Sequence, residues 1–233
     1  MSSSNPFQTG KNFFLFFIPL SLLTAVILLL IFKLDVRNQI QMIELSERHN
    51  LKILFEHEQE EFDHIASDLY VLSEHHELKK YLQQASSADI HDLHSDWGYL
   101  QTSRKVYDQI RYIDSSGQER IRLNFSNGSS VIVPETQLQN KSNRYYFKKT
   151  HNLGRGDVFV SPLDLNVENG HIEEPYKPMI RFGTPVFDQE GQKQGVLLLN
   201  YLADELILTL NDDLHHSSRG DVMLVNADGY WLS

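Results

Sequence analysis

The chain has 233 residues, of which 41% are hydrophobic and 22% are charged. This composition is typical of one or two globular domains and excludes a disordered or fibrous chain. The formal net charge of -10 and the lack of a nucleic-acid-binding motif argue against nucleic acid as a partner. The absence of cysteine excludes disulfides, thiolate metal sites and cysteine nucleophiles.

An uncharged apolar run, FFLFFIPLSLLTAVILLLIF, occupies residues 13–32 between Lys11 and Lys33. At about 1.5 Å per residue, a helix of this length crosses a bilayer core of roughly 30 Å. The alternative, a cleaved signal peptide, has an apolar region of about 7–15 residues that ends in small residues. Here the run continues into KLDVRNQ, so we predict an uncleaved transmembrane helix over residues 13–33. The flanking charges do not set its orientation, because both sides are basic.

A long segment without Pro or Gly follows the span, from Val36 to about Leu82. Its apolar residues recur at the spacing of an amphipathic helix, at Leu51, Phe55, Phe62, Ile65, Leu69 and Leu72. We therefore predict one long helix within residues 34–93. The acidic stretch EHEQEE interrupts the apolar stripe, and either a solvated helix or a like-charged partner helix would account for it. A second, short helix is predicted over residues 95–105.

From Val106 onward, apolar and polar residues alternate with the period of two that is typical of strands. VYDQIRYID and QERIRLNF flank a Ser-Ser-Gly turn and predict a β-hairpin. GDVFVSPLDLN, YKPMIRFGTPVF and GVLLLNYL predict three more strands, preceded by a short helix at RYYFKKT (144–150). Five strands joined mostly by short turns after a long helix indicate an α+β fold with an antiparallel sheet. The lack of crossover helices excludes a parallel, doubly wound fold.

The last residues predict the start of a further module. A helix is predicted at LADELILTL (202–210) and a strand at VMLVN (222–226), followed by the turn ADG. One strand, a turn and four residues cannot close a second sheet. We therefore expect the sequence to be a fragment whose second domain is incomplete.

Four segments after the span follow one another in a defined order: NRYYFKKT, FVSPLDLNVENG, KPMIRFGTPVFDQEGQKQGVLLLNYL and VMLVNADGYWL. In this order they resemble four parts of the double Cache sensor domains, the PAS-like extracytoplasmic modules of bacterial histidine kinases, diguanylate cyclases and chemoreceptors. These parts are an Arg-x-Trp-Tyr helix, the strand and loop after it, the last two strands of the membrane-distal module, and the opening hairpin of the membrane-proximal module. The resemblance covers roughly residues 36–233.

This resemblance implies an inner-membrane receptor with a cytoplasmic amino terminus and a periplasmic sensor region. It also implies a homodimer, a small-molecule ligand, and a cytoplasmic output domain beyond residue 233 that is a diguanylate cyclase or a histidine kinase. The implied organisation is a cytoplasmic terminus (1–12), the transmembrane helix (13–33), a long periplasmic helix (34–93), the membrane-distal PAS-like module (94–201), a connecting helix and loop (202–220) and the beginning of the membrane-proximal module (221–233).

A candidate ligand-binding site centres on the short helix at 144–150. Arg144 and Phe147 are three residues apart and lie near one face of this helix together with Tyr146, beside the loop that carries Asp164 and Asn166. An arginine fork binds a carboxylate in two places, and aromatic rings exclude water. Alternatively, the aromatic residues only plug the sheet and Arg144 pairs with a surface acid. The candidate ligand-binding residues are Arg144, Tyr146, Phe147, Asp164, Asn166, Arg181 and Asn200.

The family's amino-acid-binding pattern is only partly present. That pattern has Tyr five residues before the Arg, Trp two residues after it and Asp at the end of the last strand, where this chain has Gln139, Tyr146 and Asn200. Asp164 matches the pattern's other Asp. Because an ammonium group would lose one carboxylate partner, the resemblance implies a carboxylate-bearing or other small polar ligand.

Several arginines fall within predicted strands. Gln109, Arg111 and Ile113 are expected to share one strand face. We expect Arg120 to pair with an acid across the strands, at Asp108, Asp114 or Glu119. Surface pairing is a less satisfactory explanation for Arg111, Arg122 and Arg181. Arg181 lies in KPMIRFGTP, which we expect to be a central strand, and an unpaired guanidinium in such a strand is costly. Either the LNVEN loop with Glu173 or Glu174 neutralises Arg181, or a ligand does.

No catalytic site is predicted. The sequence has no nucleophile with a matching base, no nucleotide-binding glycine loop and no pair of catalytic carboxylates. HDLH and EHHE lack a convincing set of further metal ligands, so neither a metal nor a cofactor is expected. Two function classes remain: ligand sensing, and a membrane-anchored scaffold or interaction module without a small ligand.

Overall fold

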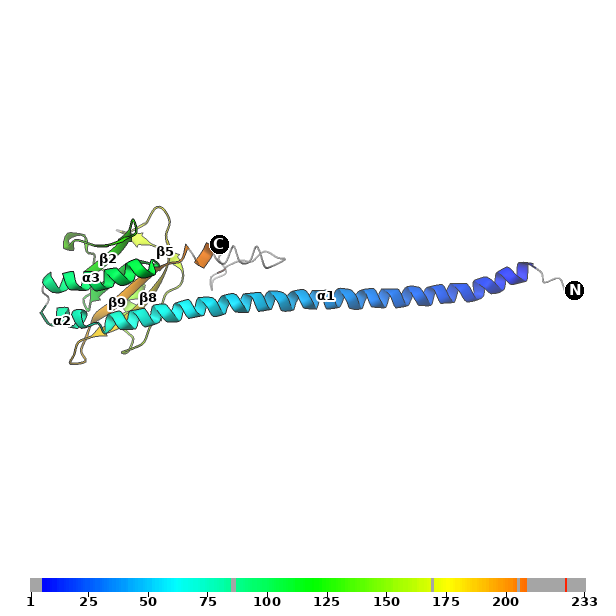
Figure 1. Ribbon diagram of the computed structural model, residues 1–233, viewed down its shortest axis with the longest axis horizontal. Coiled ribbons are helices and arrows are strands. Elements are labelled where there is room, and N and C mark those ends of the chain that lie inside the picture. The colour runs from blue at the N-terminus through cyan, green and yellow to red at the C-terminus, as the bar shows by residue number, and fades with distance from the viewer. Residues whose placement is uncertain (1–5, 85–86, 169, 205, 209–224, 226–233) are drawn as a thin grey trace. The chain divides into compact units, whose positions relative to one another are not determined.

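The computed structural model of the protein describes residues 6–84, 87–168, 170–204, 206–208 and 225 (Figure 1). The chain divides into two compact units, residues 1–53 and 54–233. The described part of the first unit belongs to helix α1 (Pro6–Ser73). Within Phe13–Ser73 an 18-residue window has a mean hydropathy of 2.9 and no buried residue, so this helix is long and apolar enough to cross a membrane.

The second unit contains the end of α1 and a series of shorter elements. Its helices are α2 (His76–Gln84), α3 (Ser87–Arg104), the 3₁₀ helix η1 (Glu135–Gln137) and α4 (Tyr145–His151). Its strands are β1 (Tyr107–Asp114), β2 (Glu119–Ser126), β3 (Ser129–Ile132), β4 (Phe159–Val160), β5 (Asp164–Leu165), β6 (Val167–Glu168), β7 (His171–Ile172), β8 (Pro178–Phe187) and β9 (Lys193–Leu202).

Seven strands form one sheet in the order β3-β2-β1-β9-β8-β4, with β5 also paired to β8. Every pairing is antiparallel, which confirms the predicted α+β class with an antiparallel PAS-like sheet. The strand predicted at 156–166 is divided into β4 and β5, and both parts lie along β8. Strand β3 was not predicted, because its four residues follow directly on a turn in which Asn127 and Gly128 have positive φ.

The helical boundaries differ from the prediction. The long helix ends at Ser73 instead of continuing to about Leu82, and the segment up to residue 93 contains α2 and the start of α3. No Pro or Gly marks the break. Instead, the turn at Glu74 and His75 lets α2 place Leu78 and Tyr81 in the core beside the sheet, so tertiary packing overrides local helix propensity. The predicted helix at 144–150 is present as α4.

One face of the sheet carries the main hydrophobic core. Helices α1, α2 and α3 contribute Ile65, Leu69, Leu78 and Trp97, which are completely buried. These side chains pack against apolar residues of the central strands, among them Ile110, Leu123, Phe182, Leu197 and Leu199. The alternation of each strand therefore directs its other side chains to the opposite face, where the polar groups described below gather.

Helix α4 covers part of that opposite face, over a glycine. A Cβ atom added to Gly183 of β8 would lie 2.6 Å from Thr150 Oγ1 of α4 and 2.6 Å from Leu198 Cδ2 of β9. Gly183 therefore permits the close approach of α4 to the sheet. Tyr146 and Phe147 of α4 are buried in the same contact.

We expect Gly183→Ala to lower the free energy of unfolding by about 1–3 kcal/mol, the usual effect of overpacking, because α4 must move away from the sheet. Chemical denaturation of the full chain in lipid nanodiscs would measure the change. Gly154→Ala is the matched control, since an added Cβ there meets only the exposed Asp157 carboxylate, at 3.1 Å. Equal effects of the two substitutions would show that α4 is not held by this contact.

Residues 209–224 and 226–233 lie outside the described part of the chain. Most of the predicted connecting segment and the predicted beginning of a second module fall within them. Both remain predictions.

Candidate ligand-binding site

A row of polar side chains crosses three central strands. Gln109 of β1 pairs with Asn200 of β9, and Asn200 pairs with Arg181 of β8. All three are buried, with exposed fractions of 3%, 0% and 2%. Asn200 Nδ2 donates a hydrogen bond of 3.0 Å to Gln109 Oε1. We call these three residues the polar row.

Arg181 connects the polar row to α4 and to the loop that carries Asp164 and Asn166. Its Nη1 donates to Asp164 Oδ1, and its Nη2 donates to Asn166 Oδ1 at 3.2 Å. The guanidinium lies 5.0 Å from the centroid of the Tyr146 ring. The structure thus brings five of the predicted residues together, namely Tyr146, Asp164, Asn166, Arg181 and Asn200.

Tyr145, which the sequence did not single out, completes this group. Its hydroxyl donates a 2.6 Å hydrogen bond to Asp164 Oδ2. Burial and this hydrogen bond raise the pKa of Tyr145 to about 12, so the hydroxyl stays protonated near neutral pH. Asp164 is therefore held between a phenol and the Arg181 guanidinium.

Two more arginines lie beside the polar row. Arg111 of β1 and Arg122 of β2 are register partners, and both are buried. Opposed like charges destabilise a sheet unless an acid neutralises them. Glu168 of β6 does so, with its Oε1 2.8 Å from Arg111 Nη2 and its Oε2 3.2 Å from Arg122 Nη1. Glu119 adds a second carboxylate, 3.3 Å from Arg111 Nη1.

Two further groups reach Glu168 from the segment after η1. Gln139 Nε2 donates to Glu168 Oε2 at 2.9 Å, and Lys141 Nζ lies 3.7 Å from the same oxygen. We call Glu168, Arg111, Arg122, Lys141 and Gln139 the Glu168 cluster. Burial would raise the pKa of Glu168, but Arg111, Arg122 and Lys141 outweigh it and lower the pKa to about 2.

The Glu168 cluster retains positive charge. Burial, followed by repulsion from Arg111, lowers the pKa of Lys141 to about 8, so Lys141 is still mostly protonated at pH 7. Lys141 and the two arginines are three cations, and Glu119 and Glu168 supply two carboxylates. One positive charge is left over, which suits the binding of an anion.

Buried polar atoms without a hydrogen-bond partner concentrate in the same place. Within the described residues, Arg111 Nε, Arg181 Nε and Asn200 Oδ1 make no hydrogen bond. A buried polar group left unsatisfied costs about 1–3 kcal/mol, and such groups are rare in native proteins. With Glu119 Oε1, four of the seven such atoms among the described residues belong to this group, which makes this face the candidate contact surface for a polar ligand.

Arg144 is the residue at the N-cap of α4 and is half-buried. Its guanidinium lies 5.6 Å from the centroid of the Tyr146 ring. Among the described residues no acid pairs with it, so the predicted alternative of a surface ion pair is not found. Phe147, in contrast, packs against Ile113, Val196 and Leu198 in an apolar cluster, and the structure does not bring it to the polar row.

The structure identifies the ion-pair partners of Arg120 and Arg181. Arg120 Nε pairs with Asp114 Oδ2 at 2.6 Å in an exposed position, which confirms its predicted cross-strand role. Arg181 is neutralised within the chain, by Asp164 rather than by Glu173 or Glu174. Glu173 instead contacts Lys177 at 2.8 Å.

The sequence alone did not identify Glu168, Lys141 or Tyr145 as members of the site, and it marked Gln139 only as the residue that replaces a tyrosine of the family's pattern. Glu168 belongs to the LNVEN loop, which was predicted to neutralise Arg181 but neutralises Arg111 and Arg122 instead. A usable signal was the pair of arginines on the two strands of the predicted hairpin, Arg111 and Arg122, because buried guanidinium groups require an acid nearby.

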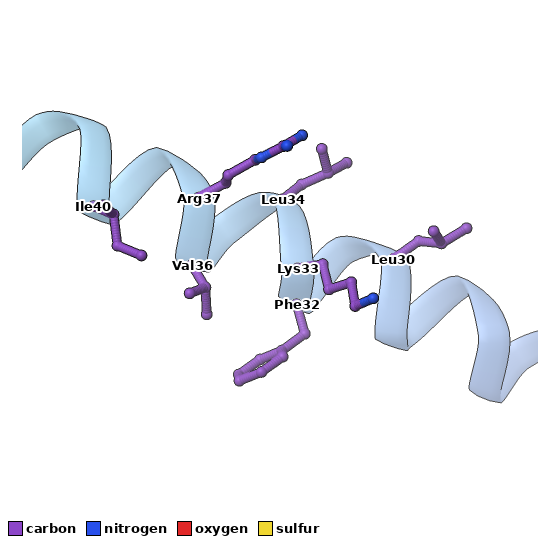
Figure 2. Close-up of a pocket in the computed structure, with 7 residues that line it drawn as sticks. All are labelled: Leu30, Phe32, Lys33, Leu34, Val36, Arg37 and Ile40. Carbon is purple, nitrogen blue, oxygen red and sulfur yellow. The ribbon is translucent and has the colours of Figure 1, made fainter.

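Neither a metal site nor the pocket on α1 adds to the candidate ligand-binding site. Within the described residues there is no group of three or more His, Asp or Glu side chains that could hold a metal ion. Figure 2 shows a pocket on α1 whose lining residues, Leu30, Phe32, Lys33, Leu34, Val36, Arg37 and Ile40, project from one helix in different directions. Its basic residues stand at the end of the apolar run, where lysine and arginine extend toward the membrane surface.

The pKa of Glu168 predicts an acid-dependent loss of stability. The pKa falls from the usual 4.5 to about 2 on folding, so the unfolded state binds a proton at higher pH than the folded state. The stabilisation is present above pH 4.5 and is lost as the pH falls toward 2, by about 3 kcal/mol at 1.36 kcal/mol per pKa unit. Denaturation of Glu168→Gln and wild type between pH 7 and 2 would measure it. A difference between the two that stays constant over this range would contradict the prediction.

Comparison with known proteins gives several matches. A family model described as the bacterial histidine kinase sensor domain matches residues 55–233. One similar solved structure is a domain from Vibrio parahaemolyticus assigned to the sensory box/GGDEF family, with 26% sequence identity and a TM-score of 0.66. The alignment covers 72% of this chain and 64% of that domain.

A second solved structure is the extracellular domain of a protein assigned as a histidine kinase. It has 26% identity and a TM-score of 0.65, and the alignment covers 72% of this chain and 61% of that domain. This chain therefore spans less than two thirds of either solved domain. No curated protein matches the chain.

The ligand-binding domain of the Campylobacter jejuni chemoreceptor Tlp3, in complex with 4-methylisoleucine, is also similar. Its sequence is 12% identical, its TM-score is 0.58, and the alignment covers 78% of this chain and 65% of that domain. At this identity the likeness shows a common fold alone.

Proposed function

Because the chain belongs to the family of bacterial histidine kinase sensor domains, matched over residues 55–233, we propose that it is the ligand-sensing input region of a membrane-bound receptor. The predicted membership of a Cache-like class of sensor domains is thereby confirmed. The proposed ligand is a small polar solute that bears a carboxylate. One observation carries this choice: buried arginines gather on a sheet face where Arg111 Nε, Arg181 Nε and Asn200 Oδ1 have no partner among the described residues.

The ligand is proposed to lie between α4 and the polar row. Arg144 and Arg181 both stand over the Tyr146 ring, at 5.6 and 5.0 Å from its centroid. Arg144 is without an acidic partner in the described chain and can accept a carboxylate through two parallel hydrogen bonds. Asn200 and Asp164 would contact the remaining polar groups of the solute.

We propose an inner-membrane location with the amino terminus in the cytoplasm and the sheet in the periplasm. The apolar part of α1 supplies the span. Ligand binding would shift the second unit between two states of different affinity, and the shift would pass to a cytoplasmic diguanylate cyclase or histidine kinase domain of a longer protein.

A homodimer is also proposed. After the apolar run, α1 exposes Val36, Ile40 and Ile43, spaced four and three residues apart. This spacing is that of the contact positions in a two-stranded coiled coil. Cross-linking of the full chain in membranes would reveal the dimer.

A thermal-shift screen tests the ligand against the alternative of a scaffold without one. Carboxylates, amino acids and amines are added to the full chain in lipid nanodiscs. A ligand at 100 times its Kd stabilises the folded state by about 2.7 kcal/mol, which is readily seen as a rise in Tm. We expect at least one carboxylate, and no plain amine, to raise the Tm. If no saturating candidate does so, the scaffold is favoured.

A further inference from the structure

The hairpin that carries Glu168 is attached at its two ends. Asn166, just before β6, donates its N–H to Lys177 O at 2.9 Å, and the carboxylate of Glu173, just after β7, lies 2.8 Å from Lys177 Nζ. Strands β6 (Val167–Glu168) and β7 (His171–Ile172) form a two-stranded sheet of their own, separate from the main sheet. His171 and Ile172 are exposed, and the core clusters include no residue of either strand. Between these ends, the ion pairs of the Glu168 carboxylate link the hairpin to the sheet.

The basic groups around Glu168 are, in contrast, firmly fixed. Arg111 and Arg122 project from the paired strands β1 and β2. Lys141 is held by its backbone, because its N–H donates to Gly117 O at 2.6 Å. A Cβ atom on Gly117 would come within 2.4 Å of Ser142, so this segment and the β1–β2 turn are in tight contact. A rigid basic site thus receives an acid from a hairpin that lies outside the main sheet.

We propose that Arg111, Arg122 and Lys141 form an anion-binding subsite, that Glu168 occupies it as a tethered carboxylate, and that a ligand carboxylate binds there by displacing Glu168. The exchange replaces one carboxylate by another, so the buried cations stay paired throughout. The leaving Glu168 moves to solvent together with the hairpin. The inference rests on the proposed function for the existence of a natural ligand.

Displacement would also release the second arginine site. Asn166, which accepts a hydrogen bond from Arg181, lies two residues before Glu168, whereas Asp164 belongs to β5 and is paired with β8. Movement of the hairpin would pull on the Asn166 contact and free Nη2 of Arg181 for the ligand. The same step therefore opens the polar row and changes the conformation of residues 166–168 and 170–173, which supplies the two states that signalling requires.

The covalent attachment of Glu168 to the chain also limits which carboxylates can displace it. An intramolecular carboxylate competes at a high effective concentration, so a simple carboxylate alone displaces it poorly. An effective ligand must add contacts elsewhere, for instance to Arg144 or the polar row. This favours solutes with a carboxylate and at least one further polar group.

Acetate, which is the missing part of the side chain in Glu168→Ala, provides the test. The Tm of the full chain in nanodiscs is measured in sodium acetate and in sodium chloride of equal ionic strength. We expect Glu168→Ala to be less stable than wild type in chloride and to regain Tm in acetate. The apparent Kd for acetate should be at least tenfold lower in the variant than in wild type.

Glu173→Ala is the matched control. Glu173 lies on the same loop and contacts Lys177 and Asn166, but none of the cations of the Glu168 cluster. Acetate should affect this variant no more than wild type. If acetate and chloride act equally on Glu168→Ala, or if acetate stabilises all three proteins equally, the tethered-carboxylate proposal is wrong.

Glu168→Gln covers the case in which the alanine variant does not fold in either salt. The amide keeps the volume but lacks the charge, so acetate should displace it at least tenfold more readily than it displaces Glu168. Equal acetate affinity in Glu168→Gln and wild type overturns the proposal. None of these results depends on the natural ligand, whereas a failed ligand screen would contradict the proposed function and leave the acetate results unchanged.

Discussion

Replacement of Arg111 by methionine is expected to lower the free energy of unfolding by about 3–5 kcal/mol, as found when one partner of a buried ion pair is removed. Arg111 is 1% exposed and lies within 3.3 Å of both Glu119 and Glu168. The substitution leaves Glu119 without its nearest cation. Urea denaturation of the full chain in nanodiscs would measure the loss.

Two comparisons make this result specific. Arg120→Met removes an exposed cross-strand pair and should cost less than about 1 kcal/mol. The double variant Arg111→Met with Glu119→Gln should regain part of the stability, because it removes the uncompensated buried charge as well. A loss below 1 kcal/mol in Arg111→Met would mean that the Glu168 cluster is not the buried network described above.

Arg144→Ala is expected to weaken binding of the natural ligand by about 2–5 kcal/mol, the usual cost of removing one side of a desolvated charge pair at an interface. Stability should change far less, because Arg144 is half-buried and no described acid depends on it. Arg144→Lys should recover only part of the affinity, since an ammonium group cannot reproduce the two parallel hydrogen bonds.

Calorimetric titration with the best carboxylate from the screen would measure this effect. Arg120→Ala serves as the control and should leave the affinity unchanged. An unchanged affinity in Arg144→Ala, combined with a large loss of stability, would identify Arg144 as a structural residue and place the ligand elsewhere.

Much of the fold could be predicted because its signals are local. The period-two alternation of β1 correctly placed Arg111 on the same face as Gln109 and Ile113, and Arg181 was correctly expected in a central strand. The break after Ser73 could not be predicted, because it has no local marker and follows from the packing of Leu78 and Tyr81 against the sheet.

The site was less accessible to sequence reasoning. The acid at its centre, Glu168, is distant in sequence from the arginines that it contacts. It is 57 residues from Arg111 and 46 residues from Arg122. No spacing rule connects such positions, since the loop conformation decides which acid meets which guanidinium. The need for an acid was predictable from burial, but its identity was not.

Hydrogen–deuterium exchange of the full chain, with and without the carboxylate that stabilises it most, tests the central claim most directly. The claim is that a carboxylate binds on the arginine-rich face of the sheet and moves the loop formed by residues 166–168 and 170–173. Exchange should change in this loop and in α4, while α3, on the other face, stays as it was. Unchanged exchange in both segments under saturating ligand, or a change confined to other parts of the chain, would contradict the account.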